Sequence, residues 1–193
     1  MGFQIVAAII LLAFYGCYFG KMFLQRRQGI QTDQIGKGKD GIVKIIELTM
    51  KVATISVPVA EVISIYVNTT FLPIWARYVG IVFAVLGDVI FVISVLTMKD
   101  SWRAGVSATD KTELVTDGIY QISRNPAFFG FDLVYIGVSL LFFNWILFLL
   151  SVFAMIMFHL QIVNVEEPFL VSVFGEDYME YKKKVNRYLG RKK

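Results

Sequence analysis

The sequence has little of what stabilises small secreted domains or builds metal sites. It contains one cysteine, one histidine and four prolines in 193 residues. A single cysteine excludes an internal disulfide framework, and one histidine beside one cysteine argues against a dedicated zinc site. Charged residues are also scarce, at 18%, and a net charge of +4 spread over such a chain is not that of a nucleic-acid-binding domain. We therefore expect neither a metal nor a nucleic-acid partner.

Apolar residues, by contrast, are abundant. They make up 56% of the chain, aromatic residues make up 15%, and the mean hydropathy is +0.64. Soluble domains average about 45 to 50% apolar and about 25% charged residues, so both figures depart in the same direction. The composition indicates an integral membrane protein, and the length suits one compact domain.

Long apolar segments predict an all-α fold with five membrane-spanning helices. Three spans are expected at 3–20, 45–67 and 74–98, with a kink at Pro58. The segment 133–165 then has 33 residues without Asp, Glu, Lys or Arg. As one helix it would be about 50 Å long, whereas a bilayer core is about 30 Å thick. It must fold back, and Asn144 is the natural corner of a tight helical hairpin formed by 126–143 and 145–166.

Basic residues are distributed unevenly among the connections. Segments 21–44, 99–124 and 165–193 hold 17 of the 19 Lys and Arg, while the connections 68–73 and 142–146 hold none. The positive-inside rule then predicts an N-terminus outside and three cytoplasmic segments, including a loop near 25–44. We divide the chain into three N-terminal spans, 1–98, and a half, 99–193, that combines a cytoplasmic connector, the hairpin and a C-terminal helix.

The C-terminal region has a helical stripe of apolar residues. Steps of three or four residues predict an amphipathic cytoplasmic helix carrying Leu170, Phe174, Tyr178, Tyr181, Val185 and Tyr188. Lys182, Lys183 and Lys184 crowd together near its end. Such a helix can simply pack against the rest of the protein, lie on a membrane surface or cover the mouth of the hairpin.

The hairpin brings charged residues to the same depth on its two arms. Arg124 is expected level with Glu166 and Glu167 at the cytoplasmic rim. Asn125 followed by Pro126 suggests a capped helix start, whose free N–H groups and partial positive charge suit an anion. The arginine fork also suits a carboxylate, and the glutamates suit a cation. The rim therefore predicts either a zwitterion site or a structural ion pair that closes the hairpin.

Other charged residues lie inside the predicted spans. Asp132 is expected level with His159, where the two either hydrogen-bond within the hairpin or transfer a proton. Ionisable groups at membrane depth are costly and point to pairing or function. Together with Glu61 and Asp88 they leave open a different class of protein, a non-enzymatic transporter with an ion or proton path.

Motifs in the second half resemble a known family. They are Leu114-Val115-Thr116-Asp117-Gly118-Ile119-Tyr120, then Arg124-Asn125-Pro126-Ala127-Phe128-Phe129-Gly130, and finally Glu166-Glu167 followed by Phe174-Gly175-Glu176-Asp177-Tyr178 and Tyr181. This order resembles the C-terminal half of the isoprenylcysteine carboxyl methyltransferase family, whose relatives include membrane phospholipid methyltransferases. The resemblance spans about 114–190. The family's helix-start motif has His and Tyr where this chain has Asn125 and Phe128, so any hydrogen bond made there differs.

The resemblance implies a methyltransferase that uses S-adenosylmethionine and releases S-adenosylhomocysteine. The acceptor would be the α-carboxylate of an isoprenylated cysteine that enters from the bilayer lipids, with the active site facing the cytoplasm. The implied cofactor-binding residues are Leu114, Val115, Tyr120, Asn125, Pro126, Phe128, Glu166 and Glu167. Arg124, which would steer the acceptor carboxylate, and Glu167 are the implied catalytic residues. A phospholipid or another lipophilic amine or thiol is the alternative acceptor; an amine must lose a proton, which would give Glu167 or His159 a role.

Overall fold

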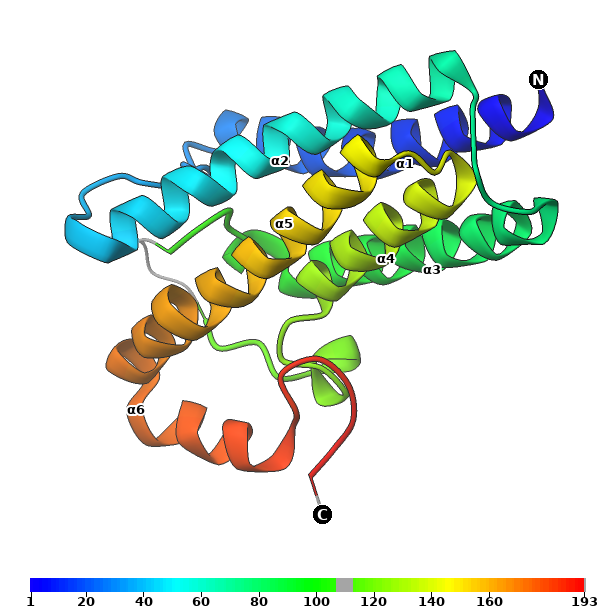
Figure 1. Cartoon of the computed structure of the whole chain (residues 1–193). Coiled ribbons are helices and arrows are strands. Elements are labelled where there is room, and N and C mark those ends of the chain that lie inside the picture. Colours follow the sequence, from blue (N-terminus) through cyan, green and yellow to red (C-terminus); the bar gives the residue numbers. More distant parts are fainter. Residues whose placement is uncertain (107–112, 193) are drawn as a thin grey trace.

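The computed structural model describes residues 1–106 and 113–192, and these are helical apart from their connections and two isolated β-bridges. The elements in chain order are α1 (Gly2–Arg27), α2 (Gly41–Val67), α3 (Ile74–Met98), η1 (Lys99–Ser101), η2 (Gly118–Gln121), α4 (Pro126–Leu141), α5 (Trp145–Gln161), η3 (Ile162–Glu166) and α6 (Glu167–Lys184). In Figure 1, α1 to α5 run alongside one another as an elongated bundle, and α6 turns away from its end. The predicted all-α class is confirmed for the part that the structure describes.

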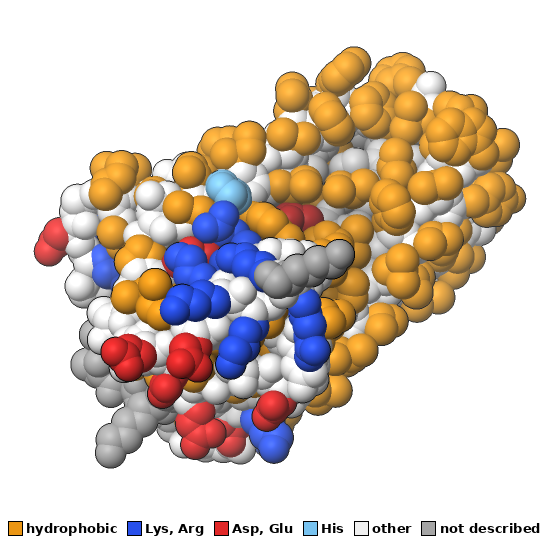
Figure 2. Space-filling model, turned by 90° about the horizontal axis from the view of Figure 1, so that it is seen from below, with side chains coloured by type: hydrophobic (Ala, Val, Ile, Leu, Met, Phe, Trp, Pro, Cys, Tyr) orange, Lys and Arg blue, Asp and Glu red, His pale blue; other side chains and the backbone are white. Residues whose placement is uncertain are grey.

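Four helical runs are long and apolar enough to cross a membrane. They are Gly2–Arg27, Gly41–Val67, Ile74–Ser101 and the run Trp145–Lys184, which includes α5, η3 and α6. α4 is apolar but has 16 residues, and is therefore about 24 Å long. Apolar side chains cover much of the bundle, whereas charged side chains gather at one end on the face shown in Figure 2. An apolar belt above a charged end is the surface of a protein embedded in a bilayer.

The hairpin corner lies where the sequence places it. The Asn144 side chain accepts a hydrogen bond from Leu147 N at 2.9 Å, which caps α5. Its amide also donates to Ser64 Oγ at 2.8 Å and so ties the corner to α2. Pro58 lies inside α2, which continues through it as one helix from Gly41 to Val67.

A seam of glycines joins α3 to α4. A Cβ atom at Gly80 would lie 2.5 Å from the carbonyl oxygen of Gly137, and one at Gly137 would lie 2.5 Å from Ala84 N. Gly87 and Gly130 approach each other in the same way, about two turns nearer the rim. Small residues at a membrane helix interface allow two backbones to touch. The seam fixes the position of α4, whose first turn carries the rim residues.

The C-terminal helix is shorter than the stripe predicted. α6 ends at Lys184, it is interrupted at Gly175 (φ 49°), and Val185 is extended, so Val185 and Tyr188 lie beyond it. Backbone hydrogen bonds hold the tail against the segment before α4 instead: Arg124 N donates to Asn186 O at 3.1 Å, and Gly190 N donates to Ile122 O at 2.7 Å. These long-range bonds replace the ones that further helix would make, and the periodicity does not reveal them.

Candidate active site

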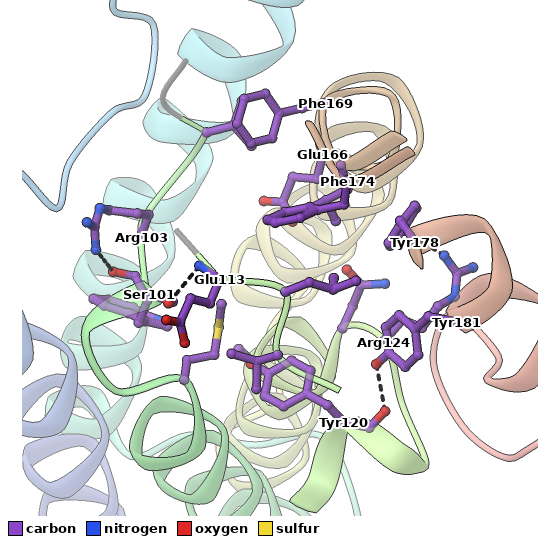
Figure 3. Close-up of a pocket in the computed structure, with 18 of the residues that line it drawn as sticks. Ser101, Arg103, Glu113, Tyr120, Arg124, Glu166, Phe169, Phe174, Tyr178 and Tyr181 are labelled. Carbon is purple, nitrogen blue, oxygen red and sulfur yellow. Dashed lines mark hydrogen bonds between the residues drawn. The ribbon is translucent and has the colours of Figure 1, made fainter. Parts of the chain in front are cut away.

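A cavity opens where the connector, the start of α4 and α6 meet. We call it the rim cavity; α6 contributes Phe169, Phe174 and Tyr178 to its wall, and the connector contributes Arg103 and Glu113. Figure 3 shows the two connector residues and Tyr178 on opposite sides of it. The C-terminal helix therefore forms part of the wall, which is the covering role that was one of three predicted for it.

Most of the predicted cofactor residues meet in this cavity. Its lining includes Leu114, Val115, Tyr120, Asn125, Phe128 and Glu166, together with Arg124. Pro126 begins α4 behind this wall and is buried. The residues that sequence reasoning missed are Phe169 on α6, Met98 at the end of α3 and most of the connector; the aromatic type of Trp102 and Phe169 is the one signal that could have pointed to them.

The two neighbouring glutamates point to different surroundings. η3 is a π-helical turn that ends at Glu166, and α6 begins at Glu167. Successive helical residues project about 100° apart, so Glu166 lines the cavity while Glu167 turns towards the C-terminal tail. π-helical turns often occur at functional sites because they re-aim side chains in this way.

Glu167 is the centre of a buried ionic cluster, here called the clasp. Its carboxylate, 7% exposed, lies 3.1 Å from Arg124, 2.9 Å from Lys182 and 2.7 Å from Arg187. Its hydrogen bond with Arg187 raises the pKa of that guanidinium. The clasp joins the start of α4, the start of α6 and the tail, so the ion pair predicted as the structural alternative is present.

Arg124 and Asn125 are engaged by the tail as well. Arg124 donates to Tyr178 Oη at 2.7 Å and to Val185 O at 3.1 Å. The Asn125 side chain donates to Arg187 O at 3.1 Å and makes no capping bond to α4, so the predicted side-chain cap is wrong. Tail carbonyls compete for the side chain that would otherwise cap the helix.

Tyrosines close the floor of the rim cavity. Tyr181 donates to the carbonyl oxygen of Tyr120 at 2.6 Å, and both side chains are buried together with Tyr178 and Val185. Burial raises the pKa of Tyr120, so this phenol remains neutral. This hydrogen bond joins η2 to α6 at the cavity, although Tyr120 and Tyr181 are 61 residues apart in the chain.

The deeper pair, Asp132 and His159, is not joined by the expected hydrogen bond. His159 Nδ1 lies 2.7 Å from Tyr188 Oη, in the tail, and not against Asp132. Among the described residues Asp132 Oδ1 has no hydrogen-bond partner. The expected hydrogen bond between Asp132 and His159 is therefore wrong, because the tail reaches the outer face of α5 and occupies the imidazole.

A second cavity lies inside the bundle beside the first. This apolar cavity, of about 550 Å³, is bounded by α1, α2, α4 and α5, with Tyr15, Phe19, Ile55, Pro58 and Phe158 among its walls. Phe19 and Ile55 are each 60% exposed on the surface of the bundle. The cavity therefore reaches the apolar outer surface of the bundle. Nothing in the sequence patterns predicted it, because its walls come from helices that are distant in the chain.

The two cavities share a wall. Both are lined by Trp102, Arg103, Gly105, Ala127 and Phe128. We call this set the junction. Molecules bound in the two cavities would meet at the junction. The rim cavity is reached from the charged end of the protein, and the apolar cavity from its apolar side.

The residues of the rim cavity suit an adenosyl sulfonium. Glu166 and Glu113 offer carboxylates to cationic groups, and Phe128, Phe169 and Phe174 offer ring faces to a purine or to a sulfonium. The arrangement can hold a cationic, aromatic cofactor, while the junction brings an apolar molecule next to it.

Comparison with known proteins finds methyltransferases among those similar to this chain. The family model described as "Phospholipid methyltransferase" matches residues 75–177. Protein-S-isoprenylcysteine O-methyltransferase of Schizosaccharomyces pombe is 42% identical over 72 residues, covering 37% of this chain and 30% of that protein. The Xenopus laevis protein of the same name is 31% identical over 113 residues, covering 58% and 39%, respectively. A probable protein-S-isoprenylcysteine O-methyltransferase of Oryza sativa subsp. indica is 30% identical over 114 residues, covering 58% and 60%.

The chain thus spans 30 to 60% of the length of these relatives. The matches confirm the resemblance that the motifs of the second half indicate, and the family match covers more than half of the chain. The chain belongs to the phospholipid methyltransferase family.

Proposed function

We propose that the protein is a membrane methyltransferase that uses S-adenosylmethionine to methylate the α-carboxylate of an isoprenylated cysteine. The observation that carries this proposal is the junction between a rim cavity with carboxylates and aromatic rings and an apolar cavity that reaches the lipid face. A water-soluble cationic donor and a lipophilic acceptor need such a pair of sites. The names of the relatives support the choice of a carboxyl acceptor.

In this proposal the rim cavity binds the cofactor. Leu114, Val115 and Tyr120 line its nucleoside end, and Asn125 and Phe128 form the wall at the start of α4, with Pro126 behind them. Glu166 faces the cationic part. Glu167 acts through the clasp, by holding Arg124 and the tail in the positions that close the cavity.

S-adenosylmethionine, when bound, would supply a methyl group on a positively charged sulfur that a carboxylate can accept directly. A carboxylate with a pKa near 3.5 is already ionised at neutral pH, so the protein needs no general base. Its residues would instead align the two molecules at the junction and exclude water. Arg124 supports this by fixing the first turn of α4, which carries Ala127 and Phe128 of the junction.

A phospholipid amine is the second candidate acceptor, favoured by the description of the family model. An amine must lose a proton during methylation. The two bases considered for this from the sequence are engaged elsewhere, because Glu167 is held by three cations and His159 by Tyr188. This engagement favours the carboxyl acceptor.

We further propose five membrane crossings, with the N-terminus outside and the rim cavity facing the cytoplasm. The charged end in Figure 2 and the asymmetry of Lys and Arg along the sequence support this orientation. The hairpin would cross twice, with the short helix α4 shielded by α3 and α5. Residues 1–98 would supply most walls of the apolar cavity, and residues 99–193 the cofactor site.

Binding of S-adenosylhomocysteine to the purified protein tests the cofactor part. Titration calorimetry in detergent or nanodiscs should give saturable binding, and Glu166→Gln should weaken it at least about tenfold, the scale of one charge-assisted contact. Glu180→Gln is the matched control because Glu180 is 70% exposed on α6. Absence of binding by folded wild-type protein would refute the proposal.

A further inference from the structure

A surface pocket of about 430 Å³ lies between the C-terminal tail and the connector. We call it the tail pocket; of its lining residues, Tyr181 alone also lines the rim cavity. Within the part of the chain that the structure describes, its charged lining consists of three cations, Lys184, Arg191 and Lys192, and one carboxylate, Asp117. A hollow with this balance of charge suits an anionic ligand.

The tail brings these cations together by folding back on itself. An antiparallel β-bridge joins Val185 to Arg191, and Lys192 N donates to Lys184 O at 2.9 Å. Lys184 and Lys192 therefore lie opposite each other across the fold. Like charges that face each other in an antiparallel pair are destabilising. The folded tail thus contains a repulsion that a bound anion would relieve.

Uncharged oxygens orient the two cations at the end of the tail. Arg191 donates to Gln121 O at 3.2 Å and to Gln121 Oε1 at 2.8 Å, and Lys192 Nζ donates to Lys182 O at 3.0 Å. Across the described residues, these bonds position both groups without an ion pair that would neutralise them. A guanidinium has five N–H donors, so Arg191 retains donors for a ligand.

Two carboxylates reduce the positive charge of the tail pocket without cancelling it. Lys184 lies 3.7 Å from Glu180, but both side chains are at least 70% exposed, and such a surface pair is weak. Asp117 lines the pocket from the connector. When both carboxylates are set against the three cations, one positive charge remains in surplus. Phosphate has several oxygens and could accept from Arg191 and Lys192 together.

The same tail holds the start of α4 and the clasp. Val185 O accepts from Arg124 Nε at 3.1 Å, and Asn186 O accepts from Arg124 N at 3.1 Å. Arg187 lies 2.7 Å from Glu167 in the clasp. A ligand that fixes the fold of the tail would therefore also stabilise the contacts that close the rim cavity.

We propose that the tail pocket binds a phosphate anion, from a lipid head group or from solution, and that the bound anion holds the tail in the position that closes the rim cavity. Binding to the tail pocket is independent of the proposed function. The effect on the rim cavity rests on that function, because the cofactor would occupy this cavity. Arg191 and Lys192, which supply the donors, lie beyond the residues 75–177 that the family model matches.

Thermal unfolding in a neutral detergent tests the binding. Phosphatidylglycerol, phosphatidylcholine or inorganic phosphate is added at constant ionic strength. Arg191→Gln and Lys192→Gln each remove one charge from the pocket, whereas Arg191→Lys keeps the charge. Lys183→Gln is the matched control, because Lys183 is exposed near the end of α6 and lines neither the tail pocket nor the rim cavity.

We expect phosphatidylglycerol to raise the melting temperature of the wild-type protein by roughly 3 to 6 °C at ten times its dissociation constant. Phosphatidylcholine should raise it less, because the pocket's cations repel its ammonium group. A rise with inorganic phosphate as well would show that the free anion suffices, and a rise with phosphatidylglycerol alone would identify a lipid head group as the ligand.

The variants separate binding in the pocket from general effects of salt and lipid. Arg191→Gln and Lys192→Gln should each lose at least half of the rise, while Arg191→Lys and Lys183→Gln should retain most of it. Melting without additives shows whether each variant is folded. If Arg191→Gln is not folded, Lys192→Gln alone decides, because its side chain is exposed and makes one hydrogen bond among the described residues.

Titration with S-adenosylhomocysteine tests the effect on the rim cavity. The anion should tighten its binding to the wild-type protein at least about fivefold, the lower end of typical coupling between two sites. The gain should be smaller in Lys192→Gln and unchanged in Lys183→Gln.

Three results would overturn the inference. The pocket binds no phosphate if neither phosphatidylglycerol nor inorganic phosphate raises the melting temperature of the wild-type protein, or if Arg191→Gln and Lys192→Gln respond as fully as it does. A rise in melting temperature with unchanged affinity for S-adenosylhomocysteine would refute the effect on the rim cavity. Failure to bind S-adenosylhomocysteine under any condition would instead refute the proposed function, while the melting temperatures would still report on the tail pocket.

Discussion

At the scale of residues, Glu166 and Glu167 show how two identical neighbours acquire different tasks. The π-helical turn before them and the helix that follows direct one carboxylate into the rim cavity and the other into the clasp. Breaking a buried ion pair costs about 3 to 5 kcal/mol, because the partner charge remains buried and uncompensated. Arg124 is in that position, since its side chain is 4% exposed and Glu167 is its carboxylate partner.

Glu167→Gln is expected to reduce methyl transfer at least about a hundredfold, because Arg124, Lys182 and Arg187 lose their common carboxylate and the tail loosens. Initial rates with labelled S-adenosylmethionine, together with thermal unfolding in detergent, measure the effect. Glu180→Gln controls for the loss of a charge on α6, where an exposed pair is worth at most about 1 kcal/mol. Equal rates and melting temperatures for the two variants would show that the clasp is dispensable.

Sequence motifs identified much of this residue-level arrangement. Leu114, Val115, Tyr120 and Glu166 were named from them and lie together in one cavity. Arg103 and Gly105 of the junction could not be found in this way, because their position depends on a bridge between Asp33 and Ala104, 71 residues apart in the chain. Pairing of two connections through backbone atoms leaves no periodic signal.

At the scale of elements, the seam between α3 and α4 determines where the cofactor site stands. Gly80, Gly87, Gly130 and Gly137 bring the two backbones into contact, and α4 then presents Arg124 and Asn125 at its start. Association of helices in a bilayer depends on such close packing, since lipid supplies little hydrophobic drive between them. Hydropathy located both helices but not this contact, because glycine differs little from other small residues on such a scale.

Gly137→Ala should lower the melting temperature by roughly 3 to 10 °C, the effect of overpacking a close interface. Its added methyl group would lie 2.5 Å from Ala84 N, so α3 and α4 must separate. Gly16→Ala is the matched control, because α1 has no neighbouring atom within 4 Å of that position. Thermal unfolding in detergent compares the two. A loss no greater than that of Gly16→Ala would mean that the seam does not fix α4.

The apolar periodicity of the sequence predicted the C-terminal helix but not the residue at which it ends. Its stripe from Leu170 to Tyr181 lies within α6, which is interrupted at Gly175, and beyond Lys184 the chain leaves the helix for bonds with the segment 122–124. There, hydrogen bonds to a distant segment determine the backbone conformation, and the helical spacing of apolar residues does not. The hairpin corner at Asn144 could be predicted because length alone requires a turn and a polar residue stands at its centre.

At the scale of the whole molecule, the proposal requires one side of the bilayer for the donor and the bilayer itself for the acceptor. The rim cavity lies at the charged end, and the apolar cavity reaches the lipid face through the surface that includes Phe19 and Ile55. Charges and cavities thus support the same proposed orientation of the bundle.

Single-cysteine labelling tests this orientation. On a Cys17→Ser background, a membrane-impermeant thiol reagent applied to intact cells should label Thr69→Cys, in the connection between α2 and α3. It should not label Asp40→Cys or Glu180→Cys until the cells are permeabilised, because basic segments are expected in the cytoplasm. All three positions are exposed. The opposite pattern would reverse the orientation and place the rim cavity outside.

The central claim is that a carboxylate accepts the methyl group, and one measurement addresses it directly. Wild-type protein in nanodiscs is supplied with methyl-labelled S-adenosylmethionine and, in separate reactions, with N-acetyl-S-farnesylcysteine or phosphatidylethanolamine. The account predicts label in the cysteine compound that mild base releases as methanol, as for a methyl ester. Base-stable label found in phosphatidylethanolamine alone would contradict it.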